Sequence, residues 1–310
     1  MFKNIVCALA IIIIPIHLLA QSLNDDLKMK KGEICLALNV SEDKWDQYWE
    51  GTFLFHNQNI GTFTRSTISP FVGIGLTNNL NLFAELPYMS THASGGQMRG
   101  VAGIQDFNLG LKYSVIHLQS SSNALKALIS ANYTRPASNY LSDYLPFSLG
   151  LGAQTLSFRT IVFASLKEEK VFIRGNFSYS HVGTTEIERA FYYADGAYYS
   201  NVMDVPSRIG YEVTIGSRIF QKRVHLECGL ANQTSLTGDD IIRYNAPQPT
   251  NKMNMTNLSG RIRIYPVPSS SIIAGFTQVI NGRNIGKSRV LSLTLTHQFM
   301  IKKQQSNNSI

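Results

Sequence analysis

The sequence predicts an all-β protein, a transmembrane antiparallel up-and-down β-barrel of about 12 strands. Strand-like segments alternate apolar with polar residues, the connections between them alternate long with short, and an apolar leader precedes them all. Barrels of outer membranes have short turns at one end, longer loops at the other, and side chains that alternate between lipid and lumen. Six long loops and five short turns imply twelve strands.

The first twenty residues have the features of a secretory signal peptide. Lys3 supplies the positive region, residues 5–19 form the apolar region, and Ala20 is the small residue at the expected cleavage point. Cys7 lies inside the apolar region without the small preceding residue expected of a lipid-modified cysteine. We expect a signal peptide at 1–20 with cleavage near Ala20, a barrel at 21–300 and a polar tail at 301–310, in the outer membrane of a Gram-negative cell.

Composition excludes two other classes. After Ala20 no run of about 18 apolar residues follows, which excludes a bundle of membrane-spanning helices. Hydrophobic residues still make up 44% of the chain, as expected when one face of each strand meets lipid. The formal net charge of +8 comes without a long basic run or an aromatic stacking motif, so we expect no nucleic acid partner. A soluble β-sandwich is the alternative fold.

The connections follow in chain order. Short turns are expected at 77–79, 119–123, 167–169, 221–223 and 266–270, and longer loops at 41–61, 93–103, 135–146, 185–206, 237–255 and 281–286. Because such barrels keep their short turns on the periplasmic side, the long loops should face the medium. The loop at 185–206 carries an aromatic tract, Phe191 to Tyr193 with Tyr198 and Tyr199. A ligand, another protein and the loop's own base are its candidate contacts, and we expect the last.

Strand parity divides the side chains between lipid and lumen. The predicted lumen-lining residues are Arg65, Glu85, Lys112, Arg174, Arg208, Glu212, Arg218, His225, Glu227, Arg261 and Arg263. With Glu33, Asp106, Lys126 and Arg159 added, nine positive groups face five negative ones. Charged walls tune selectivity, so the sequence predicts a narrow pore that mildly prefers anions or polar neutral solutes. Arg208 or Arg218 is expected to pair with Glu212 or Glu227.

Three further expectations concern local structure. Residues 147–163 do not keep one parity, because an inward Arg159 also turns Ile161 and Phe163 inward, so a β-bulge is expected near 155–158. Cys35 should face the lumen and Cys228 the lipid, on non-adjacent strands, which argues against a disulfide. Aromatic residues near strand ends are expected at the headgroup level; they are Tyr88, Tyr113, Tyr133, Tyr144, Phe147, Tyr265 and Phe299.

Several stretches carry a resemblance to a known family. They are LTNNLNLFA at 76–84, GIQDFNLGLKY at 103–113, YLSDY at 140–144, SLTGDD at 235–240 and SLTLTHQF at 292–299. With these the chain resembles the outer-membrane barrels grouped with the phenol-degradation MetA-type transporters, in their Bacteroidetes-like form. The resemblance implies passage of a small, apolar solute and no catalytic residues. The chain departs from it where a polar tail follows Phe299, the candidate signal for the barrel-assembly machinery.

Catalytic, metal and cofactor sites are not expected. The stretch GRNIGKS at 282–288 is too short for a phosphate-binding loop and leads into a strand. His225 beside Glu227 is the best acid–base pair, and ordinary wall polarity explains it better. The sequence therefore favours a channel or transporter barrel that passes a small solute passively, with membrane lipid and the assembly machinery as partners. A structural or adhesion barrel with a plugged lumen is the alternative, and an outer-membrane hydrolase a weaker one.

Overall fold

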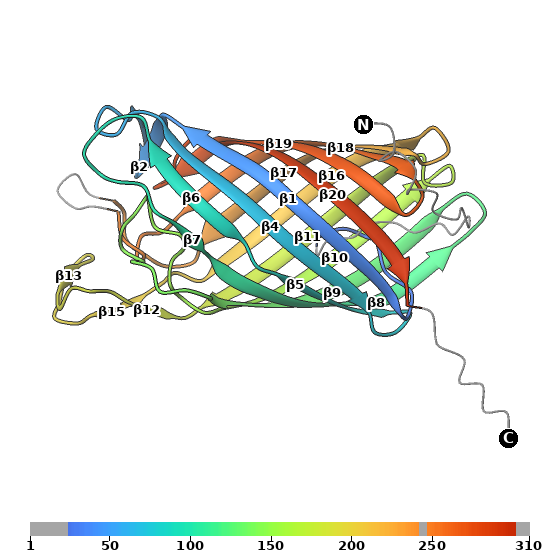
Figure 1. Cartoon of the computed structure of the whole chain (residues 1–310), viewed down its shortest axis with the longest axis horizontal. Helices are drawn as coiled ribbons and strands as arrows, with labels where there is room; N and C mark the ends of the chain where they lie inside the picture. Colours follow the sequence, from blue (N-terminus) through green and yellow to red (C-terminus); the bar gives the residue numbers. More distant parts are fainter. Residues whose placement is uncertain (1–23, 242–246, 302–310) are drawn as a thin grey trace, which may run out of the picture.

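Twelve wall strands form a closed antiparallel barrel (Figure 1), which confirms the predicted fold class. The computed structural model describes residues 24–241 and 247–301. The predicted signal peptide and nearly all of the predicted tail lie outside these residues. β1 (Glu33–Trp45) closes the barrel, because it pairs with β20 (Arg289–Met300) on one side and with β4 (Phe63–Gly75) on the other.

Ten of the wall strands are unbroken and two are interrupted. The unbroken strands besides β1, β4 and β20 are β9 (Ala124–Pro136), β10 (Thr155–Leu166), β11 (Val171–Val182), β16 (Arg208–Ile219), β17 (Val224–Ser235), β18 (Asn254–Val267) and β19 (Ser270–Arg283). The interrupted ones are β5 (Leu80–Glu85) with β6 (Tyr88–Ala93), and β7 (Ala102–Ile104) with β8 (Asp106–Gln119). The first break falls at Leu86 and Pro87, where proline lacks the N–H that the ladder needs.

All short turns lie at one end of the barrel and all long loops at the other. The turns, at 76–79, 120–123, 167–170, 220–223 and 268–269, agree with the predicted ones. The boundaries of the long loops differ more from the predicted ones than those of the turns do. β1 runs on to Trp45 because the alternation continues through Asp43, which turns inward and pairs with Arg65 at 3.9 Å. The predicted strand start at Phe147 is wrong, since β10 begins only at Thr155.

Three small hairpins extend from the long-loop end. They are β2 (Gln47–Glu50) with β3 (Phe53–His56), β12 (Thr184–Glu186) with β15 (Val202–Asp204), and β13 (Tyr192–Tyr193) with β14 (Ala197–Tyr198). Tyr192 is buried with Ile187 and Met203 and stacks on Tyr198. The aromatic tract therefore contacts its own loop, as expected.

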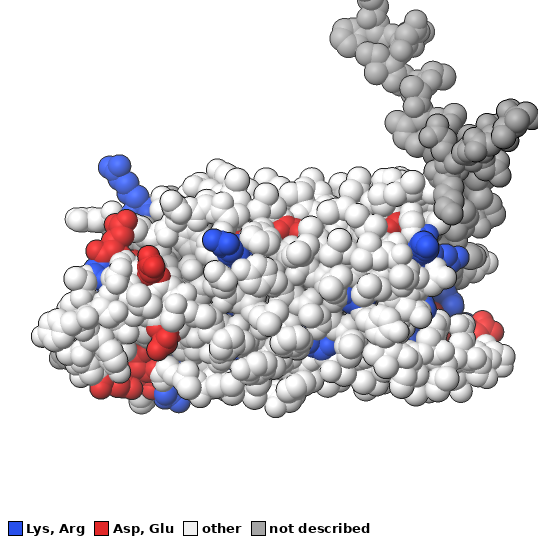
Figure 2. All heavy atoms as spheres, turned by 90° about the horizontal axis from the view of Figure 1, so that it is seen from below, with Lys and Arg blue, Asp and Glu red and all other residues white. Residues whose placement is uncertain are grey.

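The outward face of the wall is apolar. Leu, Ile, Val and Phe side chains at alternate positions are exposed, for example Leu109 and Leu111 on β8 and Leu291, Leu293 and Leu295 on β20. In Figure 2 most of this face is uncharged, and the acidic residues gather mainly at the long-loop end. Among the described residues no helix is long and apolar enough to cross a membrane.

Two expectations about which side chains face the lumen are wrong for the same reason. β10 shows no bulge, and Ile161 and Phe163 face inward with Arg159. Phe147 and Tyr265 are also buried rather than exposed at the rim. In each case the interior accepts an aromatic ring because other groups pack on it: the Lys126 ammonium lies 4.7 Å from the Phe163 ring centre, and His225 packs on Tyr265.

Cys35 and Cys228 form no disulfide, as predicted. Cys35 is buried on the inward face of β1, and Cys228 is exposed on the outward face of β17. The parity argument is therefore correct at both positions.

The barrel's orientation can be tested by cysteine labelling on whole cells. Tyr199→Cys and Lys222→Cys, each made in a Cys228→Ala background, place one exposed thiol on a long loop and one on a short turn. A membrane-impermeant maleimide should label the Tyr199→Cys protein on intact cells and the Lys222→Cys protein only after lysis. Labelling of the turn but not the loop on intact cells would reverse the orientation.

Candidate functional site: the lumen and the N-terminal segment

The interior has three levels, which can be followed along β17 from its long-loop end to its short-turn end. Asn232 and Thr234 line an outer cavity, Glu227 and Gly229 line a narrow middle region, and His225 lies beside a packed layer of cations. Because side chains from one strand contribute to all three levels, a solute crossing the barrel would meet them in this order.

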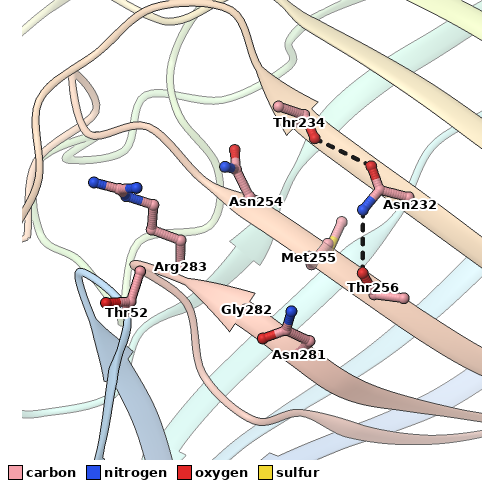
Figure 3. A pocket seen from close by; sticks show the side chains of 9 residues that line it. All are labelled: Thr52, Asn232, Thr234, Asn254, Met255, Thr256, Asn281, Gly282 and Arg283. Carbon is pink, nitrogen blue, oxygen red and sulfur yellow. Dashed lines mark hydrogen bonds between the residues drawn. The ribbon is translucent and has the colours of Figure 1, made fainter.

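The outer cavity has a volume of about 280 Å³ and a polar lining (Figure 3). It is lined by Thr52, Asn232, Thr234, Asn254, Met255, Thr256, Asn281, Gly282 and Arg283. Asn232 donates a hydrogen bond to Thr256 and accepts one from Thr234, so the amide and hydroxyl groups are held in fixed positions. Met255 is the one hydrophobic side chain in this set, so the cavity suits a polar solute better than an apolar one.

The β2–β3 hairpin forms one side of the outer cavity, and two glycines permit this. The Trp49 N–H donates to the Ile285 carbonyl, and the Lys287 N–H donates to the Gln47 carbonyl. A Cβ at Gly282 would lie 2.6 Å from the Trp49 ring, and one at Gly286 would lie 2.6 Å from the Trp45 ring. The glycines of the 282–288 stretch therefore make room for two indole rings.

Asp240 links the 236–253 loop to the rim of the outer cavity. It accepts hydrogen bonds from the Arg283 guanidinium and from Asn284, and Lys252 lies 3.9 Å away. The hydrogen bond from Arg283, which outweighs the effect of burial, lowers the pKa of Asp240 to about 2. Because the folded-state pKa is lowered, this stabilisation is complete above the ordinary value of 3.8 and is lost as the pH falls through about 2.

The middle region narrows to a cavity of about 60 Å³. Its charged lining residues are Arg174, Glu212, Glu227 and Arg261. Glu227 lies 3.0 Å from Arg174 and 3.6 Å from Arg261, and Glu212 accepts hydrogen bonds from Asn176 and Thr214. A space of this size holds about two water molecules, and we call this narrow region the constriction.

Residues 24–30, which we call the N-terminal segment, lie inside the barrel at the short-turn end. The Met29 N–H donates to Asn81, and the Asn81 amide donates back to the Met29 carbonyl. Met29 also packs against Cys35 and Phe83. The inward face of β4 leaves space for this, because a Cβ at Gly73 would lie 2.8 Å from the Met29 methyl and one at Gly75 would overlap the Lys30 carbonyl.

Asp25 and Asp26 place two carboxylates among five cations from the wall. We call these the lumenal cations: Lys112 of β8, Lys126 of β9, Arg174 of β11, Arg218 of β16 and Arg263 of β18. Asp25 lies 3.0 Å from Lys112 and 3.7 Å from Arg263. Asp26 lies 3.1 Å from Lys126, 3.2 Å from Arg218 and 3.8 Å from Arg174. Both carboxylates are 2% exposed, so the segment closes this level.

Aromatic rings and one turn residue complete the layer. Lys112 lies over Phe83, and Arg218 lies over both Phe163 and Phe172. Glu169, in the 167–170 turn, pairs with Arg218, Lys126 and Lys222. Burial raises the pKa of Glu169, but Arg218, Lys126 and Lys222 together bring it below its usual value. Two of the lumenal cations, Arg218 and Lys126, are thus paired with both the segment and the turn.

The sequence-predicted lining residues fall into three groups. Lys112, Arg174, Arg218 and Arg263 meet around the N-terminal segment, while Glu212, Glu227 and Arg261 line the middle region. Of the remaining four, His225 lies beside the cation layer and contacts the Lys222 carbonyl. The other three lie apart from both groups: Arg65 pairs with Asp43, Glu85 accepts from Ser69 and Asn108, and Arg208 heads β16. As the lining of a transport path, the set stays a prediction.

Sequence reasoning missed the partners of these residues. The expected pairing of Arg208 or Arg218 with Glu212 or Glu227 does not form, because Arg218 turns to Asp26 and Glu169 and Glu227 to Arg174 and Arg261. The signal that could have shown this is the acidic pair Asp25-Asp26 between the leader and the first strand, opposite an excess of inward cations.

The arrangement is suited to binding and sorting charged solutes. His225 and Glu227 have separate partners, so they do not form the acid–base pair considered from the sequence. Within residues 24–241 and 247–301, no cluster of three or more histidine, cysteine or acidic side chains could hold a metal ion.

Comparison with known proteins shows the fold. No family model matches the chain, and no curated protein sequence matches it. Among solved structures, the COG4313 outer membrane channel from Pseudomonas putida F1 is similar with a TM-score of 0.68 and 15% identity, over 88% of this chain and 97% of that one. The translocator domain of the autotransporter NalP from Neisseria meningitidis has a TM-score of 0.46 and 10% identity, over 87% and 90% of the two chains.

The link between Asp240 and Arg283 can be tested by proteolysis. Asp240→Asn weakens the ionic contact, so we expect cleavage within the 236–253 loop of the purified barrel to become several-fold faster at neutral pH. Asp46→Asn, which changes an exposed carboxylate outside this contact, is the control and should cleave like the parent. Equal cleavage of all three proteins would show that the contact does not hold the loop.

Proposed function

We propose that this protein is an outer-membrane channel that passes a small solute by diffusion. One observation carries the proposal: a closed barrel with an apolar outer face encloses a polar cavity and, farther from the long loops, a smaller cavity with a charged lining. A lipid-facing exterior needs no such interior for stability alone, whereas a path for solutes needs polar groups along its length. Placement in the outer membrane, entry through a signal peptide and insertion by assembly machinery belong to the same proposal.

The lining favours a polar, anionic solute over an apolar one. The resemblance to MetA-type barrels implies an apolar solute, and the outer membrane channel from Pseudomonas putida F1 shares the fold. Yet amides and hydroxyls line the outer cavity, and two arginines and two glutamates line the constriction. An apolar molecule would have to displace water from these groups without replacing their hydrogen bonds, which is unfavourable. Anions would be attracted by the surplus of lumenal cations.

A plugged barrel with a structural or adhesive role is the second candidate. The N-terminal segment favours it, since the two carboxylates and Met29 fill the interior at the short-turn end. The two functions differ in ion conductance, because a permanent plug would block ions as well as solutes.

Conductance of the mature protein in planar bilayers separates the two functions. We expect small single-channel currents, because the constriction is narrow, and a reversal potential across a salt gradient that shows preference for chloride over potassium. Clear cation selectivity would contradict the assignment of the lining, and complete absence of current in potassium chloride and in potassium citrate alike would support the plugged barrel.

The selectivity should depend on Arg261. Its side chain is partly exposed in the constriction and lies 3.6 Å from Glu227. Arg261→Gln removes one positive charge from the path, so we expect the preference for chloride to fall, with little change in barrel stability. Arg223→Gln, at an exposed turn position, removes the same charge away from the path. The proposal would be contradicted if Arg223→Gln and Arg261→Gln changed the reversal potential equally.

A further inference from the structure

Among the described residues, the lumenal cations and the groups joined to them by ion pairs include more positive than negative side chains. Seven cations and four carboxylates lie within ion-pair distance in this layer. The cations are Lys112, Lys126, Arg174, Arg218, Lys222, Arg261 and Arg263, and the carboxylates are Asp25, Asp26, Glu169 and Glu227. Half of these carboxylates belong to the N-terminal segment, which is not part of the wall.

Two buried arginines keep donors without a partner. The Nε and Nη1 atoms of Arg174 and the Nε atom of Arg218 make no hydrogen bond to any described residue. Both side chains are less than 5% exposed and already reach Asp26. An unsatisfied buried donor is costly, so these guanidinium groups could take more acceptor oxygens than the Asp26 carboxylate supplies.

The wall and the N-terminal segment differ in how they are held. The lumenal cations are fixed on five strands of a continuous sheet. The segment forms no strand, and its polar contacts include a side chain of the 76–79 turn, where Lys28 donates a hydrogen bond to Asn79. The cations would therefore stay in place if the segment left, and would then face the lumen with Glu169 and Glu227 as their remaining ion-pair partners among the described residues.

We propose that the lumenal cations are a binding site for a small solute with two or more carboxylates, and that the N-terminal segment occupies this site until such a solute displaces it. Asp25 and Asp26 indicate which ligand fits this site, because their two carboxylates, on consecutive residues, reach two separate groups of cations. A solute with carboxylates a similar distance apart would satisfy the same groups and open the short-turn end. The proposal rests on the proposed channel function in calling this ligand a transported solute.

Cys35 is a native reporter of displacement. It is buried on the inward face of β1 and packs against Met29 of the segment. In a Cys228→Ala protein, an uncharged maleimide should therefore modify Cys35 slowly. Citrate, the tricarboxylate probe, should raise this rate at least ten-fold, whereas sodium chloride at equal ionic strength should leave it unchanged. Equal rates in the two salts would overturn the proposal.

Two variants test whether the N-terminal segment occupies the site, one by removing its charges and the other by a steric clash. Asp25→Asn with Asp26→Asn removes the competing charges, and Gly75→Ala keeps every charge but adds a methyl group where the Lys30 carbonyl lies. We expect both proteins to react rapidly at Cys35 without citrate and to bind citrate at least ten-fold tighter by calorimetry. Asp46→Asn is the matched control and should behave like the parent. Should the double variant fail to fold, Gly75→Ala and the parent's response to citrate decide.

Bilayer recordings separate this proposal from the channel function. Citrate that accelerates Cys35 labelling in a protein without any current would support the site and contradict the channel. A channel that conducts chloride while citrate changes neither the current nor Cys35 labelling would support the function and overturn the site.

Discussion

The interior of this barrel depends on the contact between two carboxylates and five cations. Four of the five cations are almost fully buried, namely Lys112, Arg174, Arg218 and Arg263. The side chain of the fifth, Lys126, is 14% exposed. Without a partner, such charges would need water or a counter-ion. Asp25 and Asp26 supply that partner from outside the wall. The aromatic rings of Phe83, Phe163 and Phe172 pack on the same cations, so apolar residues on the inward face are part of the same arrangement.

The long-loop end of the barrel is held together by different contacts. There the β2–β3 hairpin packs through Trp45 and Trp49 against two glycines, and Asp240 pairs with Arg283 at the rim of the outer cavity. These contacts leave the cavity open and lined with amides and hydroxyls. The barrel thus has a polar entrance fixed by packing and a charged far end closed by ion pairs.

The sequence predicts the wall well because a strand's period of two is rigid. Once Leu109 and Leu111 are placed outward, Lys112 must turn inward, and the same rule places Arg174 and Arg218. The same rule turns Phe163 inward with Arg159 and Tyr265 inward with Arg263, as observed. The errors at these two residues come from the separate assumption that aromatic rings avoid the lumen. The rule gives no information about the N-terminal segment, which has no alternation and pairs with residues far along the chain, as Asp26 does with Arg218.

The covalent link between the N-terminal segment and β1 sets the solute concentration that is needed to displace the segment. β1 begins at Glu33, only a few residues after Asp26, and is fixed between β4 and β20. Two carboxylates on so short a tether have an effective concentration of roughly millimolar or more at the site. A free solute with comparable intrinsic affinity would have to reach a similar concentration to compete. Such a site responds to solutes that are abundant outside the cell, and it stays closed when they are scarce.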